Sequence, residues 1–262
     1  NAGNILLIGS ILLFVSIVVG KAGFRFGVPA LLLFLGVGML FGTDGLGIEF
    51  NNPQTAQFIG VIALSIILFS GGMDTSAAEI KPVLGQGIVL ATVGVMLTAL
   101  LTGYFIYYIT NLGNSFITLN FTESLLLASV MSSTDSASVF SILRSKRQGL
   151  KENLRPMLEL ESGSNDPMAY MLTILLIGII QSGESSLSNT ILQFIMQMSI
   201  GAVSGYLLGR LAVYCINKLN INQSLYPVLL LAFVFFIFSF TDLVKGNGYL
   251  AVYLAGLVVG NH

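Results

Sequence analysis

Two aspartates lie near the middle of apolar stretches that are each long enough to cross a bilayer. Asp135 lies in the stretch 125–143, and Asp166 lies in the stretch 156–180. A carboxylate in hydrocarbon costs roughly 3 kcal/mol on insertion scales, so such a group is expected to be functional or paired. Both aspartates are flanked by polar, helix-disrupting residues, and this combination predicts a site for a cation or a proton.

The second aspartate belongs to the run Glu161-Ser162-Gly163-Ser164-Asn165-Asp166-Pro167. On a helix, Ser162 and Asp166 share a face and Asn165 is adjacent to it. Glu161 lies about 140° around the helix from Asp166, so we expect it to have a different partner. The alternative is structural: Asp166 is held by hydrogen bonds from Asn165 and Ser164 and locks helix packing.

Pro167 is expected to loosen this helix. Proline has no N–H, so it frees the carbonyl of Gly163 one turn earlier. A carboxylate, the Ser162 hydroxyl and a freed carbonyl would then lie close together near mid-membrane. Oxygen ligands of this kind suit a hard monovalent cation.

The first aspartate lies in a polar interruption of an apolar helix, formed by Ser129 and the run from Ser132 to Ser136. These side chains compete for backbone groups and favour local unwinding. Broken helices near the midplane are how transporters expose carbonyls and helix ends to ions. Asp135 is then expected to neutralise the N-terminal end of a half-helix. The alternative is a polar kink that packs against a neighbour.

Two further glutamates precede Asp166 on the same stretch. Glu159 lies four residues after Arg155, which predicts a surface ion pair of little energetic value. Glu161 lies deeper and needs a cationic partner, which we expect beyond residue 262.

The composition is that of an integral membrane protein. Of 262 residues, 55% are hydrophobic and 9% are charged, whereas soluble domains carry about 25% charged residues. Cys215 and His262 are the single cysteine and histidine, which excludes an internal disulfide and argues against a His/Cys metal site. No basic stripe suggests a nucleic-acid partner, and no cofactor is expected.

About 20 apolar residues span a bilayer, and on this basis the sequence predicts an all-α polytopic membrane protein. The expected spans are nine: 4–20, 28–42, 57–71, 85–110, 122–143, 155–181, 188–215, 225–241 and 247–260. Ten of the eleven Lys and Arg residues fall in odd-numbered connections, and Lys245 is the exception. By the positive-inside rule these connections are cytoplasmic, and the N-terminus lies outside.

Glycines at three positions suggest close helix packing. Gly201, Gly205 and Gly209 follow one another at steps of four residues and predict a small-residue face. Gly71 and Gly72 are expected to form a bend at the end of the third span. Because the chain begins without Met and stops at the end of a span, we expect it to be a fragment of a longer protein.

The motifs resemble a known family. Ser133-Thr134-Asp135 on one span and Glu161-Ser-x-x-Asn165-Asp166 on the next are similar to the monovalent cation/proton antiporters of the NhaP and sodium/proton exchanger type. The run from Glu161 to Ala169 looks closest to the bacterial potassium/proton branch. The resemblance covers the whole chain in span order.

The resemblance implies an inverted-repeat antiporter fold with an unwound helix around Asp135, in one membrane transport domain. Residues 1–181 would form the first six-helix repeat, 182–218 the linking helix and 219–262 the start of the second repeat. It also implies a homodimer in the inner (plasma) membrane, built from the first three spans and the eighth and ninth. Gly256 and Gly260 are expected to permit contact with the second copy. A nucleotide-binding regulatory tail would lie outside this chain.

Carried over by residue, the resemblance implies that Asp166 binds either the cation or a proton. Ser162 and the Thr134 backbone contribute oxygens to the cation, while Asp135 balances half-helix ends. Asn165 is associated with electroneutral exchange, and Glu161 pairs with an Arg on a later span. Many members carry an acidic residue where this chain has Ser70, which weakens any claim for a ligand on the third span.

The expected function is secondary active antiport of cytoplasmic K⁺ or Na⁺ against protons, by competition for Asp166, without enzymatic catalysis. One alternative is a cation channel, which would lack proton coupling. A less favoured alternative is an intramembrane aspartyl protease with Asp135 and Asp166 as a dyad. Neither aspartate lies in a Gly-x-Gly-Asp or Tyr-Asp sequence, and Asn165 has no role in such an enzyme.

Overall fold

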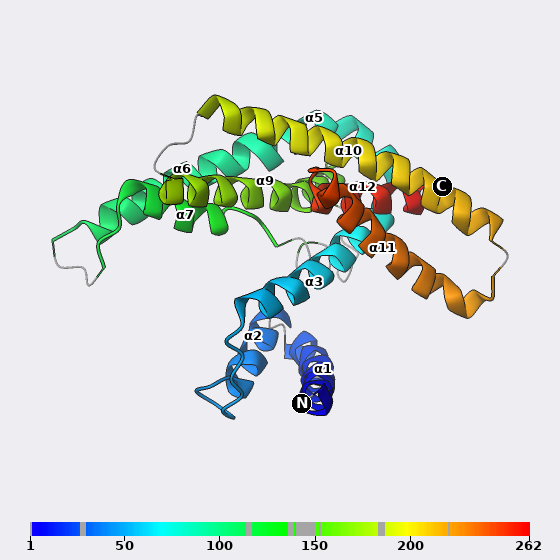
Figure 1. Cartoon of the computed structure of the whole chain (residues 1–262), viewed down its shortest axis with the longest axis horizontal. Coiled ribbons are helices and arrows are strands. Elements are labelled where there is room, and N and C mark those ends of the chain that lie inside the picture. Colours follow the sequence, from blue (N-terminus) through cyan, green and yellow to red (C-terminus); the bar gives the residue numbers. More distant parts are fainter. Residues whose placement is uncertain are drawn as a thin grey trace. The chain divides into compact units, whose positions relative to one another are not determined.

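The computed structural model describes residues 2–26, 30–113, 117–135, 139, 150–151, 153–182, 187–219 and 221–262 (Figure 1). Every regular element among them is a helix, which confirms the all-α prediction. The chain forms two compact units, residues 1–59 and 60–262.

The first unit contains α1 (Ala2–Phe26), α2 (Ala30–Phe41) and the start of α3 (Pro53–Asp74). Helices α1 and α2 pack against each other. Gly20 permits this approach, because a Cβ there would lie 3.1 Å from Cε1 of Phe34. Both helices carry an apolar segment of the kind predicted for 4–20 and 28–42.

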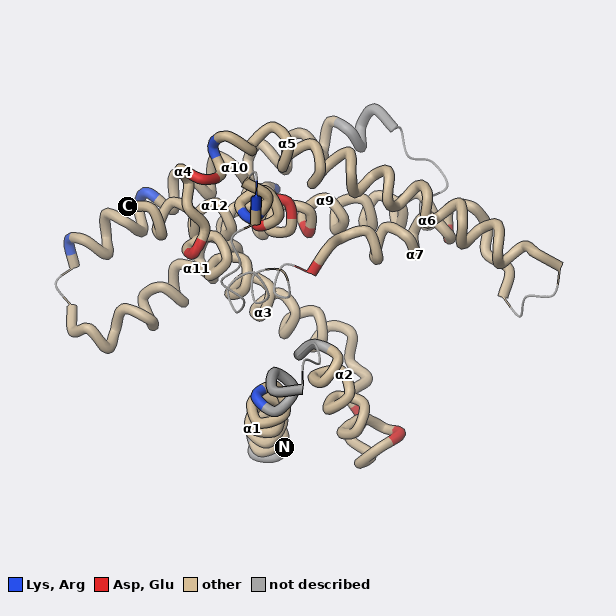
Figure 2. The backbone as a smooth tube through the Cα atoms, turned by 180° about the vertical axis from the view of Figure 1, so that it is seen from behind, with Lys and Arg blue, Asp and Glu red and all other residues tan. Residues whose placement is uncertain are grey.

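The second unit continues α3 and adds a long helical segment over 77–110, which is interrupted by a 3-10 turn after α4 and by a π-helical turn before α6. Its elements are α4 (Ala77–Ile80), the 3-10 turn Lys81–Val83, α5 (Leu84–Val89), the π turn Leu90–Gly94, α6 (Val95–Thr110), α7 (Phe121–Val130), α9 (Leu154–Ser182), α10 (Leu187–Lys218), the 3-10 turn Gln223–Leu225, α11 (Tyr226–Leu243) and α12 (Gly248–Gly260). Within the described ranges, five helical segments are long and apolar enough to cross a membrane, and four apolar helices are shorter. These segments correspond to the nine predicted spans. Figure 2 shows that charged residues are sparse along them.

Helix α12 lies at the centre of the second unit. Its Ala251, Val252 and Ala255 are buried in an apolar cluster with Phe69 of α3 and Ile237 of α11. On another side, its Tyr253 packs with Leu68, Ile80 and Leu160. Helix α12 therefore joins α3, α9 and α11, and it also packs along α10 (Figure 1).

The predicted small-residue face of α10 is confirmed. A Cβ on Gly201 would lie 2.7 Å from the carbonyl oxygen of Asn247, and one on Gly205 would lie 2.6 Å from that of Ala251. Real Cβ atoms do not approach so closely. Glycine therefore allows the backbones of α10 and α12 to touch, the packing mode of membrane helices with small residues at their interface.

The expected bend at Gly71 and Gly72 is wrong. Gly71 and Gly72 lie inside the continuous helix α3 and form no bend that ends it, and a Cβ on Gly72 would collide with the backbone of α12. Gly256 is buried against α3, where an added Cβ would collide with the backbone of Phe69, and a Cβ on Gly260 would collide with that of Met73, although Gly260 itself is exposed. The contact of this face with a second copy stays a prediction. Both sets of glycines serve one close contact between α3 and α12.

Candidate ion-binding site

Helix α9 carries Asp166 and runs without interruption from Leu154 to Ser182 with Pro167 inside it. The expected loosening around Gly163 and Pro167 is therefore wrong. Pro167 is fully buried, and Gly163 packs so closely on the Tyr253 ring that a Cβ would lie 2.5 Å from its Cε2. Packing holds the helix together across the missing N–H.

Helix α7 brings the second aspartate to α9. It begins with a capping box: the Asn120 side chain accepts the Glu123 N–H at 2.9 Å, and the Glu123 carboxylate accepts the Asn120 N–H at 2.8 Å. Such a cap satisfies two otherwise unpaired donors. The helix ends at Val130, ten residues after it begins.

The end of α7 coincides with the predicted polar interruption. Ser129 Oγ donates to the carbonyl oxygen of Leu126 at 2.8 Å, and Ser132 Oγ donates to that of Ser129 at 2.7 Å. Residues 131–135 are not helical. The predicted unwinding is confirmed as far as Asp135, while the rest of the span 122–143 lies outside the described residues except for Val139. The Val139 N–H donates to the Asp135 carbonyl oxygen at 3.0 Å.

The non-helical segment lies against α9, and its Ser133 contacts Asp166 directly. Ser133 Oγ is within hydrogen-bond distance of Asp166 Oδ1 and lies 3.1 Å from Asn165 Oδ1. Asp166 is partly exposed, whereas Asn165 is fully buried. One hydroxyl therefore touches both members of the Asn-Asp pair.

Thr134 contacts the other predicted residues. Its hydroxyl oxygen accepts from Asn165 Nδ2 and lies 3.2 Å from Glu161 Oε2 and 3.3 Å from Ser162 Oγ. Asn165 Nδ2 also donates to Glu161 Oε1 at 2.9 Å. The amide of Asn165 thus links the α7 end to Glu161, and each of its polar atoms has a partner.

A pocket of about 430 Å³ opens beside this network, and Asp166, Ser133, Thr134 and Asp135 all contribute to its wall. The remaining wall is formed by Leu64, Ile67, Val130, Ala169, Tyr170 and Thr173. Ser162 and Asn165 are fully buried and are not among its lining residues. Two carboxylate-bearing and four hydroxyl-bearing residues therefore line the pocket, and their oxygens are ligands suited to a hard cation or to proton exchange.

Sequence reasoning missed Tyr170 and Thr173, which share the Asp166 face of α9 at i+4 and i+7. Tyr170 makes an edge contact with Tyr249, with centroids 5.8 Å apart. Thr173 Oγ1 lies 3.0 Å from Ser129 Oγ. The helical spacing from Asp166 was a usable signal, but nothing in the sequence indicated that this face lines a pocket.

The ion pair between Arg155 and Glu159 is present, with Nε and Oε1 3.0 Å apart. It differs from the surface pair we expected, because Glu159 is only 4% exposed. A buried carboxylate depends on its partner far more than an exposed one does. For Glu161, the part of the chain that the structure describes supplies neutral hydrogen-bond donors and no ion pair.

Known proteins share both the sequence and the fold. The chain is 43% identical over 259 residues to the K(+)/H(+) antiporter NhaP of Alkalimonas amylolytica, covering 98% of this chain and 44% of that protein. It is 37% identical over 264 residues to the K(+)/H(+) antiporter NhaP2 of Shewanella oneidensis, covering 100% of this chain and 44% of that protein. The chain thus spans less than half the length of these relatives.

The fold matches the sodium proton antiporter MjNhaP1 from Methanocaldococcus jannaschii with a TM-score of 0.78 and 22% identity, covering 98% of this chain and 62% of that one. Residues 9–262 match the sequence pattern of the family described as sodium/hydrogen exchanger, transmembrane. The chain therefore belongs to the sodium/hydrogen exchanger family of membrane proteins.

Proposed function

We propose that the protein containing this chain is a secondary transporter, not an enzyme, and that it exchanges K⁺ or Na⁺ against protons. One observation carries the proposal: Asp166 faces a pocket together with Ser133, Thr134 and Asp135, at the point where α7 is unwound. Unwound helices beside a midplane carboxylate are how transporters build ion sites. Both relatives are K(+)/H(+) antiporters by name, which favours K⁺ as the cation.

The mechanism is competition for the Asp166 carboxylate. When ionised, Asp166 binds a cation with help from nearby hydroxyl oxygens, and when protonated it has no charge to offer. Ser162 and the Thr134 backbone are the further oxygens of the proposed site, and Asp135 balances the ends of half-helices. Asn165 and Glu161 hold Thr134 in place, because Asn165 bonds to both.

Exchange is proposed to be electroneutral, since Asn165 is neutral and a single carboxylate alternates between one cation and one proton. The wider arrangement is proposed to be one transport domain in the inner membrane, with the N-terminus outside. Residues 1–181, 182–218 and 219–262 would be the first repeat, the linking helix and the start of the second repeat. A homodimer is proposed, built from the first three spans and the eighth and ninth.

The test is exchange by the full-length protein in proteoliposomes with a pH-sensitive dye inside. An outward K⁺ or Na⁺ gradient is expected to acidify the lumen, and a panel of alkali cations would rank the preference. Cation flux without proton movement would indicate a channel and contradict the proposal. Cleavage of a helical peptide by the pure protein would indicate a protease.

A further inference from the structure

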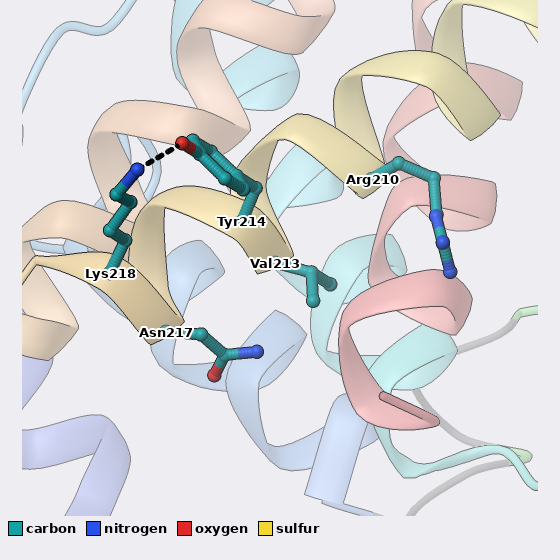
Figure 3. A pocket seen from close by; sticks show the side chains of 5 residues that line it. All are labelled: Arg210, Val213, Tyr214, Asn217 and Lys218. Carbon is teal, nitrogen blue, oxygen red and sulfur yellow. Dashed lines mark hydrogen bonds between the residues drawn. The ribbon is translucent and has the colours of Figure 1, made fainter.

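The C-terminal end of α10 carries a basic pocket that shares no residue with the candidate ion-binding site. Arg210, Val213, Tyr214, Asn217 and Lys218 line a volume of about 390 Å³ (Figure 3). Their spacing of three and four residues places them along one side of the helix. Figure 3 shows the side chains of Arg210, Val213 and Asn217 extending from α10 at separate points along it, with Lys218 directed to Tyr214.

The positive charge here has no acidic counterpart nearby in the sequence. No Asp or Glu lies between Glu184 and Asp242, a segment that includes all of α10. Among the described residues, neither Arg210 nor Lys218 is ion-paired with a carboxylate. Two uncompensated cations beside an amide favour an anionic ligand.

Two contacts prepare the pocket for such a ligand. Lys218 Nζ donates to Tyr214 Oη at 2.7 Å and lies 5.0 Å from the centre of that ring. An ammonium has three donors, so two remain available. Arg210 offers the planar fork that binds phosphate oxygens in pairs, and Asn217, seven residues on, adds an amide donor on the same side.

The position of the pocket points to a lipid. Helix α10 has 32 residues, so it is about 48 Å long and exceeds the hydrocarbon core of about 30 Å. Its last turns therefore reach the headgroup level, where exposed tyrosines such as Tyr206 and Tyr214 are enriched. Val213 and the exposed Leu211 supply apolar surface next to the charges, as a lipid with a charged head and apolar tails requires.

We infer that this pocket binds the phosphate diester of an anionic glycerophospholipid. Arg210 and Asn217 hold the phosphate, Val213 contacts the start of the acyl chains, and Lys218 adds attraction at the membrane surface. Basic pockets beside membrane helices bind anionic headgroups by this chemistry.

The test is the melting temperature of the full-length protein in detergent, with phosphatidylglycerol, phosphatidylcholine or inorganic phosphate added. Phosphatidylglycerol is expected to raise the melting temperature by several degrees in the natural protein. In the Arg210→Gln/Lys218→Gln variant we expect less than half of this shift. Phosphatidylcholine is expected to give no shift, because its cationic choline cancels the charge of the phosphate diester, and inorganic phosphate is expected to give none because it lacks the acyl chains.

The matched control is Lys21→Gln/Lys81→Gln, which removes the same charge from exposed positions elsewhere and should keep the full shift. An equal shift in the Arg210→Gln/Lys218→Gln variant would overturn the site. An equal shift with inorganic phosphate would overturn the assignment to a lipid. The single variant Arg210→Lys keeps the charge but loses the planar fork, so it should keep part of the shift, and it provides the test if the double variant does not fold.

Discussion

Ser133 is in direct contact with the Asp166 carboxylate, because its hydroxyl lies within hydrogen-bond distance of Oδ1. Ser133→Ala removes this hydrogen bond, worth about 1.5–3 kcal/mol when one partner is charged. If the same hydroxyl helps to hold the cation, the KM for the cation should rise several-fold, beyond any effect of the lower stability. Ser133→Thr keeps a hydroxyl and serves as the control. A KM unchanged in Ser133→Ala, measured by exchange in proteoliposomes, would remove Ser133 from the site.

Asn165 is the residue whose loss should disturb the most partners. Its amide joins Thr134 to Glu161 and its carbonyl lies beside Ser133. Asn165→Ala would remove the hydrogen bonds of this fully buried amide, each worth about 0.5–1.5 kcal/mol, or about 1.5–3 kcal/mol where the partner is charged. A clearly lower melting temperature is expected, whereas Gln54→Ala at an exposed position should have no effect. Equal melting of the two variants would show that the network contributes nothing.

At the scale of elements, contact between α10 and α12 depends on the absence of side chains at three glycines. Gly205→Ala would place a Cβ 2.6 Å from the Ala251 carbonyl oxygen, and overpacking of this kind costs about 1–3 kcal/mol. Gly60→Ala is the matched change, because a Cβ there meets nothing within 4 Å. It should be neutral or stabilising by up to about 1 kcal/mol, since Ala favours helix. Thermal unfolding of both variants tests the difference.

The helices could be predicted from sequence, because in a bilayer an apolar run must bond its own backbone. The break after α7 could also be predicted, since the serines that end it act on carbonyls only three residues away. It could not be predicted that α9 stays continuous at Pro167 or that Gly72 packs against another helix. Gly163, one turn before Pro167, and Gly72 both pack against α12, which lies far along the chain.

The residues of the candidate site could likewise be predicted only in part from the sequence. Asp166 and Asp135 could be found from the cost of burying a carboxylate, and both line the pocket. The contact of Ser133 with Asp166 could not be found, because it requires the direction in which the chain leaves α7. The place of Tyr170 in the pocket likewise depends on neighbours from other helices, Tyr249 among them.

For the whole molecule, charge balance is the property that follows from a single alternating carboxylate. One cation exchanged for one proton moves no net charge. Full-length protein on a solid-supported membrane is therefore expected to give no transport current, and its exchange rate should not respond to an imposed voltage. A sustained current linked to transport would mean that Asn165 does not set the stoichiometry as proposed.

Competition at Asp166 is the central claim, and it is tested most directly by measuring the KM for K⁺ and Na⁺ against pH in proteoliposomes. If one carboxylate holds either ion, each lowers the affinity for the other by the same factor. As the pH falls below the pKa of Asp166, the KM is then predicted to rise about tenfold for each pH unit, while the maximal rate stays constant. Asp166→Asn should abolish exchange but remain folded. A KM independent of pH, or normal exchange by Asp166→Asn, would contradict the account.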